Sequence, residues 1–249
     1  MEKALTIAGL VKRFGQTTAL AGLDLEVAPG EVVGLIGPDG AGKTTAMRLV
    51  AGLLTPDAGS VTALGHEIPR RIAEVRQRIG YMPQQYSLYG DLSVEENLRF
   101  FAGMYGVPRA EFRDRSRRLL EMAHLAEFRS RPAAALSGGM YKKLVLACAL
   151  MHSPELLLLD EPTNGVDPVS RRELWVFLRE QVGAGVAVLY STPYMDEAER
   201  CDRVGLVVDG RIAAMGRPAD LVAAYPGTAM SFEDVFLSLT ARPGTEASP

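Results

Sequence analysis

Short apolar runs, several of them rich in β-branched residues, alternate with longer amphipathic segments along most of the chain. The clearest runs are VVGLIG at 32–37, LLLLD at 156–160, VAVLYS at 186–191 and VGLVVDG at 204–210. Runs of this length are typical of buried strands, and their alternation with helical patterns predicts an α/β fold with a mostly parallel sheet. Residues 1–30, GSVTALG at 59–65 and RIGYMPQ at 78–84 predict additional strands, which we expect to form an antiparallel β edge.

The strand pattern disappears between about residues 88 and 153. Ser93 and Glu96 have the spacing of a capping box in front of the helical stretch NLRFFAGMY. We therefore expect a helical subdomain at about 88–153, inserted into a single domain that covers residues 1–240. The segment ARPGTEASP at 241–249 is small and polar, and we expect it to form a disordered tail.

Composition limits the classes of partner. The 249 residues are 47% hydrophobic, and 27 Lys and Arg against 30 Asp and Glu give a net charge of −3, so no positive field favours nucleic acid. The many arginines of 109–125 alternate with acids, as on a solvated amphipathic helix. No apolar run approaches the roughly 18 residues of a membrane span, and the first residues do not resemble a signal peptide, so we expect a cytoplasmic chain. Cys148 and Cys201 lack metal-ligand spacing and are expected to be free thiols.

The stretch GPDGAGKTT at 37–45 lies between an apolar strand pattern and a helical pattern, which is the context that a P-loop requires. Its glycines let backbone N–H groups converge on a phosphate chain at a helix N-terminus. Lys43 can reach the outer phosphates, and Thr44 offers its hydroxyl to magnesium. A glycine-rich turn that matches by chance is the alternative, and the flanking strand and helix disfavour it. We assign nucleotide binding to Gly37, Pro38, Asp39, Gly40, Ala41, Gly42, Lys43, Thr44 and Thr45.

Two adjacent acids end the apolar run of ELLLLDEPT at 155–163. Asp160 at the strand end can help to hold the coordination shell of magnesium, and Glu161 can polarise a water for attack on the γ-phosphate. A buried strand that ends in a solvated turn is the alternative. A P-loop upstream favours the functional interpretation, because NTP hydrolysis needs both phosphate and magnesium ligands.

A second anion site is predicted at LSGGM, residues 136–140, in front of the helical stretch YKKLVLACALM. Ser137 and the backbone of Gly138 and Gly139 would lie at a helix N-terminus, where N–H groups attract negative charge. An ordinary helix N-cap explains Ser137 equally well when it is considered alone.

Taken together, these motifs resemble the ATP-binding subunit of an ABC transporter, in the family's order and over nearly the whole chain. GPDGAGKTT resembles Walker A, LSGGM the signature, LLLLDEP Walker B and GVDP at 165–168 the D-loop. The resemblance implies a P-loop NTPase core of the ABC-cassette type that uses ATP and Mg2+. It places Gln84 in the Q-loop, and Phe14 where an aromatic ring stacks on adenine, although a core phenylalanine is a rival there. On this basis catalysis is assigned to Glu161 and Gln84, and magnesium to Thr44, Gln84 and Asp160.

Finer phrases such as PVSRRELW, YMDEAERCD and EDVF are similar to ATPases of ABC-2-type multidrug exporters. The resemblance implies two cassettes that sandwich two ATP molecules head to tail, and a membrane-spanning permease gripped by residues 86–101. Within that segment Tyr86, Leu88, Tyr89 and Leu92 could instead pack the subdomain. The cassette would then lie at the inner face of the membrane. A nucleotide-gated interaction module and a non-transport ABC ATPase remain the alternatives, and the substrate cannot be deduced because it belongs to the permease.

Pro193 occupies the position where this family normally has the switch histidine, which contacts the γ-phosphate. Proline has neither a polar side chain nor a backbone N–H, so it cannot replace that donor. Thr192 or Tyr194 could supply a hydroxyl instead. We expect slow hydrolysis at the chain's own site, and the intact signature favours a heterodimer in which this chain serves a partner cassette.

Overall fold

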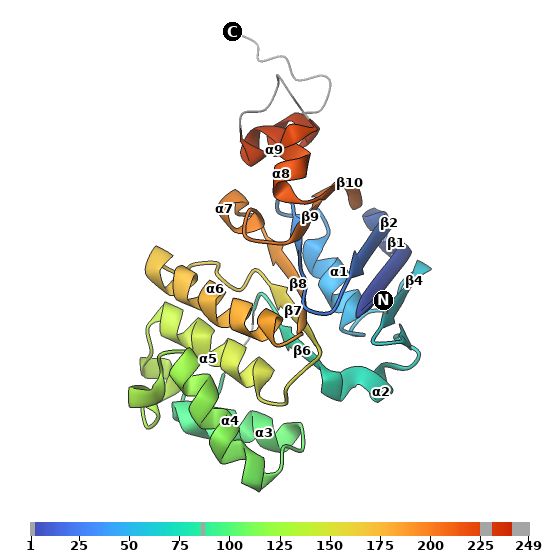
Figure 1. The fold of residues 1–249 in the computed structure, drawn as a ribbon. Helices are drawn as coiled ribbons and strands as arrows, with labels where there is room; N and C mark the ends of the chain where they lie inside the picture. Colours follow the sequence, from blue (N-terminus) through green and yellow to red (C-terminus); the bar gives the residue numbers. More distant parts are fainter. Residues whose placement is uncertain (1–2, 86–87, 225–230, 241–249) are drawn as a thin grey trace.

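The computed structural model describes residues 3–85, 88–224 and 231–240, which form two β-sheets and surrounding helices (Figure 1). The first sheet has the strand order β2-β1-β4-β5 and is antiparallel. Its strands are β1 (Leu5–Phe14), β2 (Thr17–Val27), β4 (Ala58–Ala63) and β5 (His66–Ile68). This sheet confirms the antiparallel β edge that the N-terminal residues and GSVTALG predict.

The second sheet has the order β10-β9-β3-β8-β7-β6 and carries the P-loop. Its strands are β3 (Val32–Ile36), β6 (Ile79–Met82), β7 (Leu156–Asp160), β8 (Ala187–Thr192), β9 (Arg203–Val208) and β10 (Arg211–Gly216). Every neighbouring pair is parallel except β9 and β10, which pair antiparallel. The mostly parallel sheet predicted from the four apolar runs is confirmed.

The prediction for RIGYMPQ is wrong in one respect. Its residues form β6, which pairs parallel to β7 with Ile79 opposite Leu156, and so belongs to the second sheet rather than to the antiparallel edge. Both faces of β6 are largely covered, and a run of this kind suits a parallel sheet as well as an antiparallel one. The sequence pattern indicates a strand but does not select its neighbour.

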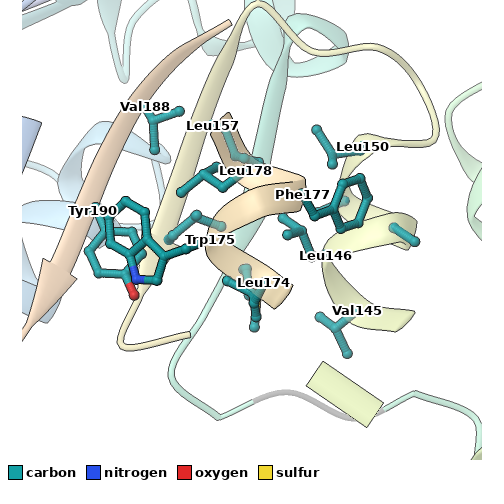
Figure 2. Packing of buried hydrophobic residues seen from close by; sticks show 14 of the residues in the cluster. Val145, Leu146, Leu150, Leu157, Leu174, Trp175, Phe177, Leu178, Val188 and Tyr190 are labelled. Carbon is teal, nitrogen blue, oxygen red and sulfur yellow. The ribbon is translucent and has the colours of Figure 1, made fainter. Parts of the chain in front are cut away.

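Buried side chains on the two faces of the second sheet enter different cores. Val32 and Ile36 of β3 pack into one cluster with helices α5 (Gly138–Leu150) and α6 (Pro168–Gly183). Val33 and Leu35 of the same strand pack into the other cluster with α1 (Lys43–Val50) and the first sheet. Figure 2 shows part of the former core, where Trp175 and Phe177 of α6 extend in different directions. Alternation along each strand therefore explains why the runs are apolar at every position.

Between β6 and β7 the described residues form helices α3 (Val94–Met104), α4 (Arg109–Met122) and α5, with short 3-10 turns between them. The capping box predicted at the start of α3 is present, because Glu96 N donates to Ser93 Oγ and Ser93 N donates to Glu96 Oε2. The remaining helices are short or flank the sheets, namely α2 (Ile72–Val75), α7 (Met195–Ala198), α8 (Pro218–Ala223) and α9 (Phe232–Thr240). Cys148 and Cys201 are buried free thiols, as expected. The tail predicted at 241–249 lies outside the described residues.

None of the helices in the described part of the chain is long and apolar enough to span a bilayer.

Candidate functional site

The P-loop connects the carboxyl end of β3 to the first turn of α1, which begins at Lys43. Two of its glycines have no room for a side chain. A Cβ on Gly37 would lie 2.6 Å from the carbonyl oxygen of Val207, and a Cβ on Gly42 would lie 2.5 Å from that of Ala19. Gly42 also has φ of 108°, which L side chains avoid. The loop therefore needs glycine at both positions to bring the first N–H groups of α1 to its open side.

Lys43 lies in this loop as a buried cation with three partners. Its Nζ donates to the carbonyl oxygens of Gly37 at 2.7 Å and Pro38 at 3.1 Å, and lies 3.5 Å from Glu161 Oε1. Gln84 Nε2 donates to the other oxygen of Glu161 at 2.8 Å. The Walker A lysine, the Walker B glutamate and the Q-loop glutamine thus form one chain of contacts, although they come from distant parts of the sequence.

Glu161 reaches the P-loop because its backbone leaves the strand conformation. Its φ is 49°, in the left-handed region that costs a non-glycine residue roughly 1–3 kcal/mol. The amide of Glu161 donates to both the carbonyl oxygen and the hydroxyl of Ser191, each at 3.1 Å, which holds the turn in place. Strain at this position fits a carboxylate that is aimed at a reacting group.

Within the described part of the chain, the side chain of Asp160 is hydrogen-bonded through one carboxylate oxygen only. Its Oδ1 accepts hydrogen bonds from Ser191 Oγ at 2.6 Å and Thr44 Oγ1 at 3.1 Å, while its buried Oδ2 has no hydrogen-bond partner among the described residues. No cluster of three or more His, Cys, Asp or Glu that could hold a metal exists among those residues. Magnesium in nucleotide sites keeps water and phosphate oxygens as ligands and needs few carboxylates, so Thr44 and Asp160 suit it.

Lys43, Thr44, Gln84 and Glu161 line one pocket of about 240 Å³, whereas the fully buried Asp160 does not line it. Its walls are Ala19, Asp39, Gly40, Gly42, Lys43, Thr44, Thr45, Gln84 and Glu161. Ala19 was not predicted, since an alanine in a strand carries no chemical signal. Phe14 does not line the pocket; it is 49% exposed at the end of β1, and its ring centroid lies 5.6 Å from Lys12 Nζ. The adenine contact of Phe14 therefore stays a prediction.

The signature residues lie outside this pocket. Ser137 is the N-cap of α5, and its Oγ accepts from Met140 N at 3.3 Å, as the capping interpretation predicts. Ser137 and Gly138 are exposed, whereas a Cβ on Gly139 would lie 2.2 Å from Ser170 Oγ. The chain therefore carries a glycine-dependent helix start that is separate from its own P-loop and open to solvent.

Among its described residues, the segment after Gln84 presents two neighbouring aromatic side chains to solvent, Tyr89 and Phe100. Leu88 is buried, which confirms the core alternative for that residue, while Tyr89 is 50% exposed beside Phe100, with ring centroids 4.6 Å apart. The fully buried Asn97 fixes the backbone of Tyr89, because its Oδ1 accepts from Tyr89 N and its Nδ2 donates to Tyr89 O, both at 3.0 Å. Tyr86 lies outside the described residues.

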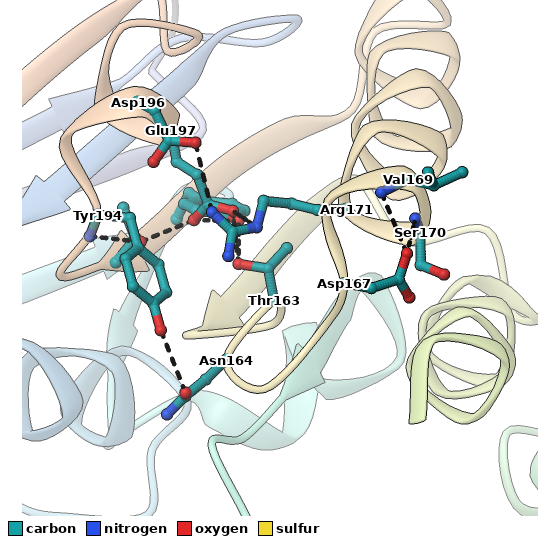
Figure 3. A network of polar contacts seen from close by, with 11 residues as sticks. Thr163, Asn164, Asp167, Val169, Ser170, Arg171, Tyr194, Asp196 and Glu197 are labelled. Atoms are coloured by element: carbon teal, nitrogen blue, oxygen red, sulfur yellow. Dashed lines mark hydrogen bonds and ion pairs between the residues drawn. The ribbon is translucent and has the colours of Figure 1, made fainter. Parts of the chain in front are cut away.

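Pro193 follows β8, and the hydroxyls of both its neighbours are hydrogen-bonded to residues that do not line the P-loop pocket. Thr192 Oγ1 donates to the buried Glu197 at 2.7 Å and accepts from Tyr194 N at 3.0 Å. The hydroxyl of Tyr194 donates to Asn164 Oδ1 at 3.4 Å (Figure 3). Neither residue lines the P-loop pocket. Glu197 was missed by sequence reasoning, since nothing in the acidic segment around it indicates burial.

A family model described as ABC transporter matches residues 20–164. The chain is 44% identical over 222 residues to the probable multidrug ABC transporter ATP-binding protein YbhF of Escherichia coli (strain K12), covering 89% of this chain and 38% of YbhF. The chain thus spans less than half of YbhF. It is 42% identical to the Nod factor export ATP-binding protein I of Ralstonia nicotianae over 88% of this chain and 68% of that protein.

It is also 42% identical to the daunorubicin resistance ATP-binding protein DrrA3 of Streptomyces coeruleorubidus, over 91% of this chain and 72% of that protein. A solved structure described as the ATP binding subunit of an ABC transporter superposes with a TM-score of 0.85 at 31% identity, covering 95% of this chain and 99% of the other. The P-loop pocket, the separate signature helix, the fold and these relatives agree, and the chain belongs to the ABC transporter family of ATP-binding proteins.

Proposed function

We propose that this chain binds and hydrolyses ATP in the P-loop pocket and thereby powers a membrane exporter. One observation carries the proposal: Glu161 contacts both Lys43 and Gln84 inside a single pocket. Thr44 also lines this pocket and donates a hydrogen bond to Asp160. The names of YbhF, the Nod factor protein and DrrA3 support the exporter role by similarity.

Each side chain has a task that follows from its position. Lys43 exchanges the carbonyls of Gly37 and Pro38 for the outer phosphates, because a phosphate carries more charge than a carbonyl dipole. That exchange removes the cation from Glu161 and leaves its carboxylate to orient and deprotonate the attacking water, with Gln84 as its remaining partner. Thr44 and Asp160 would hold Mg2+, which neutralises charge on the β- and γ-phosphates when bound.

A second cassette completes the mechanism in this proposal. Ser137 and Gly138 are exposed at the start of α5, so the signature can contact ATP held by another chain. Pro193 leaves the chain's own site short of one donor, and the loss of one such donor typically slows a reaction about 10²–10³-fold. A partner that retains a switch histidine would then perform most of the turnover, which favours a heterodimer.

The membrane subunit docks at Tyr89 in this proposal. An exposed aromatic side chain on a rigid backbone suits an interface anchor, and Asn97 supplies that rigidity. The chain would lie at the inner face of the membrane through this contact. A nucleotide-gated interaction module, which binds ATP and hardly hydrolyses it, is the second candidate function, and Pro193 is the observation that favours it.

Two measurements test the proposal. A fluorescent ATP analogue titrated into the purified chain should bind saturably and be displaced by ATP and Mg2+, and a failure to bind would refute the nucleotide site. Affinity purification from membranes of the source cell should retain a polytopic membrane protein. Co-purification with soluble partners only would refute the exporter role and favour the interaction module.

A further inference from the structure

A fully buried carboxylate, that of Glu197, lies in the segment 193–198 after β8, here called the switch loop, and does not line the P-loop pocket. Glu197 of α7 has no exposed surface, and its two oxygens accept hydrogen bonds from three hydroxyls (Figure 3). Thr163 Oγ1 donates to Oε1 at 2.5 Å, while Tyr190 at 3.0 Å and Thr192 at 2.7 Å donate to Oε2. A carboxylate has only acceptors, so all three hydroxyls point their protons at this one group.

These donors come from separate segments of the chain. Thr163 lies two residues after Glu161, in the segment 163–168 that contains the D-loop and is here called the D-loop segment, whereas Tyr190 and Thr192 belong to β8. Arg171 of α6 adds a charge, with its Nε 3.6 Å from Glu197 Oε1. Glu197 is therefore the point at which the D-loop segment, β8, α6 and α7 meet.

A second layer of contacts surrounds this centre. The guanidinium of Arg171 lies over the ring of Tyr194 at 4.7 Å and also contacts Asp196. The Tyr194 hydroxyl donates to Asn164, which is next to Thr163 in the D-loop segment. Both layers join the residues on either side of Pro193 to the D-loop segment. None of these contacts requires a polar group at position 193.

The end of β8 also connects this centre to the catalytic acids. Adjacent residues of a strand face opposite sides, so Ser191 and Thr192 point in different directions. Ser191 Oγ donates to Asp160 at 2.6 Å and accepts from the amide of Glu161 at 3.1 Å, while Thr192 donates to Glu197. One peptide unit therefore separates the Glu197 centre from the contacts of Asp160 and Glu161.

We propose that Glu197 is a positioning residue that locks the switch loop and the D-loop segment into one unit and thereby sets the placement of Glu161. The physical reason is the high cost of a buried carboxylate that loses its donors, so movement of one segment away from the others is opposed. The assignment rests on the proposed hydrolysis at Glu161 for its catalytic consequence, but the mechanical link between the loops does not depend on turnover.

Hydrogen exchange of the full-length chain tests that link. Thr163→Val removes a donor on the D-loop side and keeps the side-chain shape, and it should speed amide exchange in residues 194–200 about fivefold, as expected for one lost hydrogen bond. Thr192→Val should conversely speed exchange in residues 163–168. Tyr105→Phe is the matched control, because it removes the hydroxyl of a tyrosine that lies at the end of α3 and is stacked on His152, and α3 lies far from α7 (Figure 1). The inference is overturned if each variant changes only the segment that carries it.

Steady-state phosphate release supplies the catalytic readout. Tyr190→Phe keeps the ring that packs on Trp175 and removes only its hydroxyl, so the fold should survive. Misplacement of a catalytic group by about 1 Å can lower the reaction rate about a hundredfold. We therefore expect kcat of Tyr190→Phe to fall by about fivefold to a hundredfold, while KM and the affinity for ATP change less than about twofold. Tyr105→Phe should change neither. An unchanged kcat, or a kcat that falls only in step with ATP affinity, overturns the positioning role. Absence of ATP binding by the wild-type chain would instead refute the proposed function, and the exchange experiment would still decide the inference.

Discussion

Replacement of Lys43 by alanine perturbs the nucleotide pocket at its most connected side chain. The ammonium is 4% exposed and has three partners, two carbonyls and the carboxylate of Glu161. In the ATP complex it would meet a phosphate instead, and a hydrogen bond to a charged group contributes about 1.5–3 kcal/mol. Since about 1.4 kcal/mol corresponds to tenfold in affinity, Lys43→Ala should weaken ATP binding roughly 10- to 150-fold.

A fluorescent-ATP titration measures this loss, and Lys143→Ala provides a matched control. Lys143 is equally buried, at 5% exposed, and its Nζ donates to Glu173 Oε2 at 2.6 Å on a different helix pair. Its removal should lower the free energy of unfolding, because it breaks a largely buried ion pair, and should leave the affinity for ATP within about twofold. Equal affinity in Lys43→Ala and the wild type, or an equal loss in both variants, would refute the assignment of the phosphate cradle.

Two further predictions concern the docking surface and pH. Tyr89→Asp should weaken binding to the membrane subunit by roughly 2 kcal/mol, or about thirtyfold, as measured by co-purification, and should leave ATP binding intact. Leu53→Asp, at a side chain that is 63% exposed, should have no such effect. Loss of solubility in Tyr89→Asp would mean that this residue belongs to the core. Burial lowers the pKa of His152 from 6.5 to about 4. Between these pH values the unfolded chain binds a proton that the folded chain does not. The folded state therefore loses stability as the pH falls through this window. His152→Phe, which can keep the stacking on Tyr105, should lose less stability than the wild type on going from about pH 7 to about pH 5 in urea unfolding; an equal loss in both would contradict the assignment.

Much of the sheet and the P-loop could be predicted because local chemistry determines them. Gly37 and Gly42 lie where any side chain would collide with a neighbouring backbone carbonyl, so the geometry of the loop requires glycine at both positions of the motif. The sequences of β3 and β7 are apolar at nearly every position because both faces of each strand are buried. The position of β6 could not be deduced in the same way, because a short apolar strand fits beside either a parallel or an antiparallel neighbour.

The environment of Pro193 was predicted least well. Thr192 and Tyr194 were considered as replacements for the missing histidine, but Thr192 ends β8, Tyr194 is the N-cap of α7, and neither residue lines the P-loop pocket. Asp196 and Glu197 are neighbours of similar chemistry in the sequence, yet one is exposed and the other is fully buried. The buried hydroxyls of Thr163, Tyr190 and Thr192 distinguish them, and Thr163 lies 34 positions away along the chain.

The central claim is that two cassettes hydrolyse ATP at unequal rates. Steady-state phosphate release tests it most directly, measured for the isolated chain and for its complex with a partner cassette that has the switch histidine. The isolated chain should be slow, and Pro193→His should accelerate it, because one aimed donor is worth about 10²–10³ in rate. In the complex, Ser137→Arg should abolish most activity by placing a bulky side chain where the partner's phosphates bind, whereas Glu161→Gln should leave much of it. The account is contradicted if the isolated wild-type chain matches the complex in rate and Glu161→Gln eliminates the activity of both.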